Sequence, residues 1–242
     1  MPEKTFWFMV EFAWTSGHWR YKTSSECPGT LSVKDIHGNR MIHRRYEVHK
    51  TQEMLSFFLA PDGNHKAQTA KMVQAANKWA DAMQTGTISR SEVKTSLIST
   101  IWHTLIYPLL ALNPSKADCE KIMAPILQYC LPAMRYCCNF PRDIVFCPAK
   151  YMGVNILHLY TLQEILRIKG IIYHTTHNTG TGSFYRISLE LLLIELGMDT
   201  DLSLISYERF SALATPSLVK STWQFQYEKN VRLQHDISLP VP

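Results

Sequence analysis

The chain has 242 residues, 46% of them hydrophobic, and carries a formal net charge of +5. This length suffices for one large domain or two modest ones, each with its own core. No run of about 18 or more apolar residues predicts a membrane span, and the first residues lack a signal-peptide pattern. We therefore expect an intracellular protein, in the cytoplasm or nucleus, with no membrane partner.

The first part of the chain is predicted to be rich in β-structure. Residues 6–14 alternate with a period of two, which is typical of a strand, and the turn at residues 15–18 predicts a hairpin with residues 19–22. A second hairpin is predicted between residues 31–34 and 40–43.

An apolar run at residues 54–59 ends this β-rich part. The next residues, Asp62, Gly63 and Asn64, predict a structural turn, because Gly63 tolerates positive φ and Asn64 can cap a following helix.

Three helices are predicted next. Residues 66–84 have apolar side chains at helical spacing. Ser89 and Glu92 form a capping box that opens a second helix, which Pro108 stops. The third helix is predicted from Ser115 to about residue 130, with a break at Pro125.

Prolines and Gly153 interrupt residues 131–158, which predicts an irregular connector with a short strand at 144–146. Further helices are predicted at residues 159–173, at residues 183–196, and from a cap at Thr215-Pro216 to about residue 229.

The overall prediction is an α+β chain with a small antiparallel β subdomain followed by helices. Its parts are a β-rich segment (residues 1–64), a helical unit (65–130), the connector (131–158), a C-terminal helical region (159–232) and a frayed tail (233–242).

The order of these features is itself informative. A lysine, Lys4, precedes an aromatic strand, and the hairpins, the apolar run with its turn, the helices and the connector follow. This order resembles the C-terminal portion of a retrotransposon reverse transcriptase, an RNA-directed DNA polymerase, of the kind found in unicellular eukaryotes. The resemblance implies the end of a palm, a primer grip, a thumb and a connector, in that order.

The resemblance also assigns roles to single residues. Lys4 corresponds to a lysine near the phosphates of the incoming nucleotide. Leu55, Ser56 and Phe57 correspond to the primer grip, where Ser56 stands in place of the family's usual glycine. Gly153 belongs to a turn before a helix, with a structural role.

The thumb of such enzymes contacts the backbone of the duplex rather than its bases. The candidates for contact with the backbone of an RNA–DNA or RNA duplex are therefore Arg44, Arg45, Lys66, Lys71, Lys78, Arg90 and Lys94.

Polymerisation requires carboxylates that hold two Mg²⁺ ions. In the family these belong to residues upstream of the resembling portion, and the acids of this chain show no paired motif at a strand turn. We therefore expect no catalytic residue, no metal site and no cofactor in this chain, and no activity alone. Its partners would be the duplex and the missing upstream palm and fingers segment.

Two other readings stay open. The helices suit a protein–protein interaction module without a nucleic-acid role, in which Trp79, Trp102 and Trp223 are core residues. A hydrolase is poorly supported because no nucleophile motif is present, and Gly180-Thr181-Gly182 is interpreted as an ordinary loop. The six cysteines lack a zinc-ligand spacing and are expected to be reduced thiols.

Overall fold

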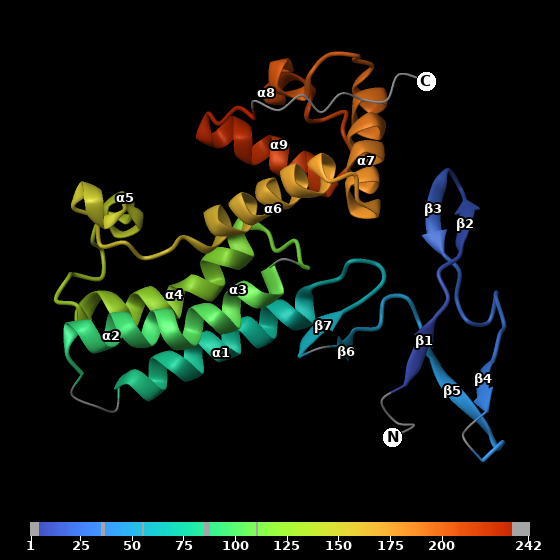
Figure 1. Ribbon diagram of the computed structural model, residues 1–242, viewed down its shortest axis with the longest axis horizontal. Coiled ribbons are helices and arrows are strands. Elements are labelled where there is room, and N and C mark those ends of the chain that lie inside the picture. The colour runs from blue at the N-terminus through green and yellow to red at the C-terminus, as the bar shows by residue number, and fades with distance from the viewer. Residues whose placement is uncertain (1–4, 35–36, 55, 85–87, 110, 234–242) are drawn as a thin grey trace.

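The computed structural model describes residues 5–34, 37–54, 56–84, 88–109 and 111–233. Within these ranges all strands lie before residue 60 and all helices after residue 65, which confirms the α+β class. Figure 1 shows the strands extending to one side of a larger helical body. Lys4, Leu55 and the predicted tail from 234 onward lie outside the described residues.

The strands form three small sheets. A mixed sheet has the order β1 (Phe6–Phe8), β5 (Arg40–Tyr46), β4 (Leu31–Lys34), and two hairpins are formed by β2 (Phe12–Thr15) with β3 (His18–Tyr21) and by β6 (Gln52–Met54) with β7 (Phe57–Leu59). Both hairpins predicted from the sequence are present, and Ser16 and Gly17 have the positive φ angles of the tight turn between β2 and β3. The parallel pairing of β1 with β5 was not predicted.

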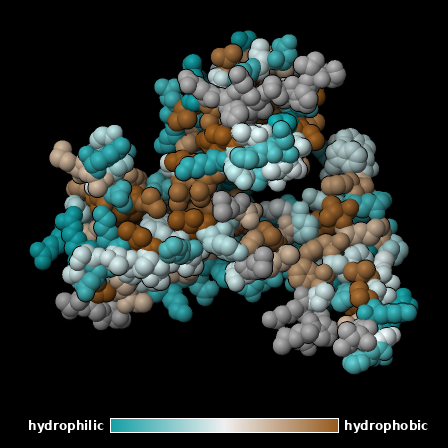
Figure 2. All heavy atoms as spheres, in the orientation of Figure 1, coloured by the Kyte–Doolittle hydropathy of each residue, from teal (hydrophilic) through white to brown (hydrophobic). Residues whose placement is uncertain are grey.

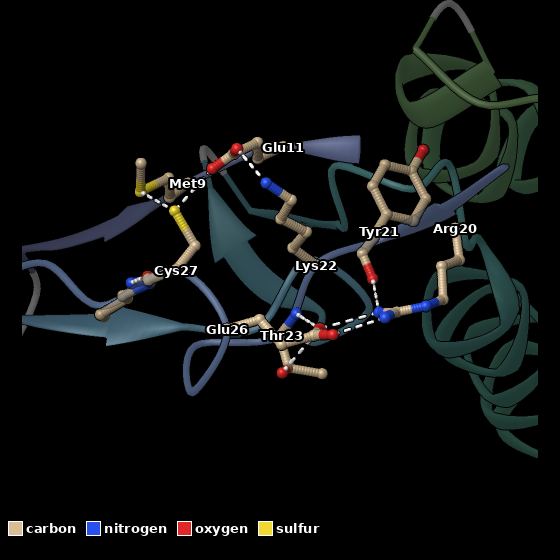
Figure 3. Close-up of polar contacts among 9 residues, drawn as sticks. Met9, Glu11, Arg20, Tyr21, Lys22, Thr23, Glu26 and Cys27 are labelled. Atoms are coloured by element: carbon tan, nitrogen blue, oxygen red, sulfur yellow. Dashed lines mark hydrogen bonds and ion pairs between the residues drawn. The ribbon is translucent and has the colours of Figure 1, made fainter. Parts of the chain in front are cut away.

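The single strand predicted at residues 6–14 is wrong, because residues 9–11 leave the strand. Glu11 holds this break: its carbonyl accepts a hydrogen bond from the backbone N–H of Lys22, and its carboxylate accepts one from the Cys27 thiol at 2.6 Å. Figure 3 shows the Glu11 carboxylate beside the Cys27 thiol and the Lys22 ammonium. The strand is thereby divided between two different pairing partners.

The helices are α1 (Lys66–Gln84), α2 (Arg90–Ser96), a π-helical segment (Leu97–Trp102), α3 (His103–Leu109), α4 (Lys116–Ala133), α5 (Arg142–Phe146), α6 (Leu159–Thr176), α7 (Gly180–Leu196), α8 (Tyr207–Phe210) and α9 (Leu218–Lys229). Short 3-10 turns lie at Ala149–Tyr151 and Leu202–Leu204. The bounds of α1 and the capping box at Ser89 are as predicted. Pro108 lies in the last turn of α3, close to the predicted stop.

Two predictions between residues 115 and 158 are wrong. Pro125 does not break α4, which continues to Ala133. Proline removes a backbone hydrogen bond, but the fully buried neighbours Ile122 and Ile126 hold the helix in the core. The predicted strand at 144–146 is part of α5, because Pro141 opens a helical turn in which its carbonyl accepts from the N–H of Ile144.

Two helix starts in the C-terminal region also differ from the prediction. α7 begins at Gly180 with Thr179 as its cap, so Gly180-Thr181-Gly182 is the first helical turn and not a loop. A side chain at Gly182 would lie 2.1 Å from the carbonyl oxygen of His174, which explains the glycine. α9 begins after Ser217, while Thr215 instead donates to Glu195.

Buried apolar side chains form two clusters. The larger joins α1 to α4 and continues through the connector to Tyr160, with Phe225 of α9 added. The smaller cluster lies between α7 and α9. Among the described residues before residue 60, none is a buried member of either cluster, although Leu59 of β7 packs against the larger one. The position of the β part therefore depends on its contacts with the helices.

A buried polar network joins α6 to the loop before α4. The side chain of Arg167 donates to Glu164, to Asn113 and to the carbonyl of Leu112, and Gln163 donates to the carbonyl of Pro114 at 3.1 Å. Glu164 is fully buried, and this burial raises the pKa of its carboxyl group, whereas the Arg167 guanidinium opposes the rise.

We expect Arg167→Met to lower the free energy of unfolding by about 3–5 kcal/mol at neutral pH, because it leaves the Glu164 carboxylate buried without its partner. The loss should shrink as the pH falls towards the unfolded pKa of glutamate, since a protonated Glu164 needs no counter-charge. Urea unfolding followed by circular dichroism at several pH values measures both effects.

The double variant Glu164→Gln with Arg167→Met is the matched control and should recover most of the lost stability. A loss that is independent of pH and is not recovered by this second change would contradict the proposed role of the pair.

Candidate nucleic-acid interface

The structure distributes the predicted cations over three places. Arg44 and Arg45 lie in β5, Lys66, Lys71 and Lys78 in α1, and Arg90 and Lys94 in α2. These seven cations do not form one continuous basic stripe, and the contacts of each side chain determine how available its charge is.

The two arginines of β5 are engaged with the sheet. The Arg45 guanidinium lies 5.2 Å from the centre of the Trp7 ring and donates to the carbonyl of Cys27. Arg44 lies 4.9 Å from the Tyr46 ring. Cation–π contacts of this kind stabilise the sheet while leaving Arg44 exposed.

The two cations of α2 contact the connector. Arg90 stacks on the Tyr136 ring and donates to its hydroxyl group, and the Lys94 ammonium lies 3.4 Å from the carbonyl oxygen of Val154. These side chains therefore have a structural role in addition to their charge.

Lys66 and Lys78 are exposed on α1. Lys66 lines an open cleft of about 500 Å³ between α1 and α4 with His65, Asp118 and Lys121. Residues seven apart share a helix face, so Lys78 lies on the side of Lys71, whereas Lys66 does not.

Lys71 is the predicted cation that the structure places beside the primer-grip-like residues. Its ammonium group donates to the Glu53 carboxylate at 2.8 Å and to the carbonyl of Ser56 at 2.9 Å, and lies 5.0 Å from the Phe58 ring. One turn earlier, the buried side chain of Gln68 accepts a hydrogen bond from the backbone N–H of Phe58 at 2.8 Å. Together Gln68 and Lys71 attach the β6–β7 hairpin to α1.

Ser56 has a φ angle of 73°, in the left-handed region that favours glycine. Met54 of β6 pairs with Phe57 of β7, so Ser56 lies in the connection between the two strands. The backbone at this position is therefore the one expected for glycine, although the residue is a serine.

The predicted turn before α1 is confirmed. Gly63 has a φ angle of 78°, the Asp62 side chain accepts from the N–H of Asn64, and Asn64 accepts from the N–H of Lys66 at 3.1 Å. Gly153 is tightly enclosed, since a Cβ there would lie 1.9 Å from the carbonyl oxygen of Cys147.

A cleft of about 360 Å³ lies between the β6–β7 hairpin, α1 and α3, and we name it the hairpin cleft. The groups on its wall that can bind a phosphate oxygen are the ammonium of Lys71, the hydroxyls of Ser56 and Tyr107, and the imidazole of His103, whereas the hydroxyl of Thr104 already donates to the carbonyl of Thr100. The Tyr107 ring meets Phe57 edge-on with centroids 5.7 Å apart. The cleft thus combines one lysine ammonium with hydroxyl and imidazole groups.

Sequence reasoning did not predict that Gln68, His103 and Tyr107 belong to this site. The available signal for Gln68 was its spacing from Lys71. The two polar residues lie three apart in α1 and therefore share one face of the helix. The wall formed by α3 depends on tertiary packing and has no local signal.

The cations of the β2–β3 hairpin are neutralised within the chain. Arg20 pairs with Glu26, and Lys22 pairs with Glu11 (Figure 3). The hydrogen bond from Arg20 is the largest cause that lowers the pKa of Glu26 to about 2, so this pair is fully charged at neutral pH. These cations are less available to phosphate than Lys78.

Comparisons of the chain with protein-family models, with curated proteins and with solved structures found no match. None of the helices in the described part of the chain is both long and apolar enough to cross a lipid bilayer. Within the same residues, no three His, Cys, Asp or Glu side chains are grouped so that they could hold a metal ion.

Replacing Ser56 with glycine should raise the free energy of unfolding by about 0.5–1 kcal/mol, because the strain of a left-handed serine exceeds the entropy cost of glycine. Thermal and urea unfolding measure the change. The matched control, Ser99→Gly at an exposed position of the π-helical segment, should instead lower stability by a similar amount. Equal losses in both variants would contradict strain at Ser56.

Proposed function

We propose that this chain holds the backbone of an RNA–DNA or RNA duplex, as the non-catalytic primer-grip and thumb portion of a retrotransposon-type reverse transcriptase. The observation that carries the proposal is the hairpin cleft, where Ser56 and Lys71 meet the donors of α3. Backbone binding requires such donors and does not require base-reading side chains.

The conformation of Ser56 supports the correspondence with a primer grip. A left-handed residue at the tip of a hairpin is the place where the family has its glycine, and the hairpin lies against α1, the first of the thumb-like helices. The net charge of +5 favours a polyanionic partner.

The β part gives a second argument, for a protein partner that covers its exposed apolar side chains. Figure 2 shows hydrophobic residues at the surface of this part. The exposed large apolar residues here include Val10, Phe12, Trp14, Trp19, Leu31, Val33 and Ile42. Exposed apolar surface of this extent is typical of an interaction site. A palm and fingers segment of such an enzyme is the proposed partner, in the cytoplasm or nucleus.

The same surface favours the alternative function, a protein–protein interaction module without a nucleic-acid role. This alternative is supported by the aromatic face of β2 and β3, where Phe12 is paired with Tyr21 and Trp14 with Trp19. Salt separates the two functions, because phosphate contacts weaken steeply as salt rises and apolar association does not.

The test is the binding of the purified chain to a labelled RNA–DNA hybrid, followed by fluorescence anisotropy across a salt series. We expect binding at low salt, and we expect Lys71→Gln to weaken it about 3–10-fold and to reduce the salt slope by about 1. Glutamine retains a donor for the carbonyl of Ser56, so the hairpin should stay attached to α1.

Lys169→Gln, an exposed change on α6, is the matched control and should leave the affinity unchanged. Polymerase activity is assayed in the same samples with added Mg²⁺, and we expect none. Absence of binding at low salt would overturn the proposal in favour of the interaction module, and DNA synthesis would overturn the view that the catalytic residues lie elsewhere.

A further inference from the structure

Helix α7 carries apolar residues on two opposite faces. The inner face contributes Leu192, Leu193 and Leu196, all buried, to the smaller core cluster. The outer face carries Phe184, Ile187, Leu191 and Ile194, which are 67%, 54%, 57% and 74% exposed. We name these four residues the α7 stripe.

The spacing of the α7 stripe is that of a helix–helix seam. Its members lie three, four and three residues apart, so they align along one side of the helix. A helix that is apolar on all sides is normally buried on all sides. In Figure 1, α7 lies at the edge of the C-terminal helices, and the exposed fractions of the four side chains show that the rest of the chain leaves the α7 stripe largely uncovered.

The surface is large enough for a pair of chains. Four large side chains with these exposed fractions present on the order of 500 Å² per copy, so two copies would bury about 1,000 Å², the lower bound for a specific interface. A single small ligand would leave most of such a long stripe exposed.

The spacing three, four, three also reads the same in both chain directions. Two copies of α7 related by a two-fold axis and running antiparallel therefore place residue 184 opposite 194, and residue 187 opposite 191. We propose that the α7 stripe is the self-association surface of this chain and forms an antiparallel helix pair with a second copy.

The charges beside the stripe make the salt response informative. Glu190 flanks the stripe, and antiparallel pairing brings it towards Glu190 of the second copy. Arg186 lies one turn before Glu190 on the same flank, so Glu190 is also brought towards Arg186 of the second copy. The repulsion and the attraction offset each other, and salt should change dimerisation little, in contrast to its effect on phosphate binding.

Sedimentation velocity of the full chain over a wide concentration range tests the proposal. We expect a monomer–dimer equilibrium, and we expect Ile187→Glu or Leu191→Lys alone to weaken dimerisation at least about 100-fold, since each change occurs in both copies. Leu204→Glu, an equally exposed change outside the stripe, is the control and should leave the equilibrium unchanged.

Mixing the two stripe variants tests the direction of pairing. Antiparallel pairing brings Glu at 187 of one copy against Lys at 191 of the other, and leaves the native Leu191–Ile187 contact intact, so the mixture should form heterodimers. Wild-type protein that stays monomeric at all concentrations would overturn the proposal, as would a mixture that does not associate.

Discussion

The position of the β part relative to the helices depends on two side chains of α1. Gln68 accepts from the backbone of Phe58, and Lys71 donates to Ser56 and Glu53, so both strands of the β6–β7 hairpin are tied to one helix face. Gln68 is buried, and a buried amide without its partner costs about 1–3 kcal/mol. The described residues of the other strands, β1 to β5, add no side chain to either core cluster, so the hairpin connects these strands to the helical body.

The same contacts define how Lys71 would meet a phosphate. Its pairing with Glu53 is partly exposed, and exposed ion pairs contribute about 0–1 kcal/mol. A phosphate entering the hairpin cleft would compete with Glu53 for the ammonium while the bond to the carbonyl of Ser56 stays in place. Binding would therefore use a lysine that the fold has already oriented, which reduces the entropy cost of ordering it.

Local signals predicted much of the fold. The turn at Gly63, the capping box at Ser89, the helix start at Ser115 and the helix end at residue 196 were all correct, because each depends on backbone geometry within a few residues. The helix break predicted at Pro125 is wrong, because core packing outweighs the one backbone hydrogen bond that the proline removes. The hairpin cleft required α3 to approach β7 across about 45 residues of chain, which no short pattern encodes.

The two exposed apolar surfaces differ in how they relate to folding. The inner face of α7 already packs in the smaller core cluster. A second copy that covers the α7 stripe would therefore join two chains that are each already folded. The aromatic face of β2 and β3 belongs to a two-stranded hairpin without a buried layer beneath it, and such hairpins are marginally stable alone. A partner on that face would therefore order the hairpin as it binds and raise its stability, whereas association through α7 would leave the folded core of each chain as it is.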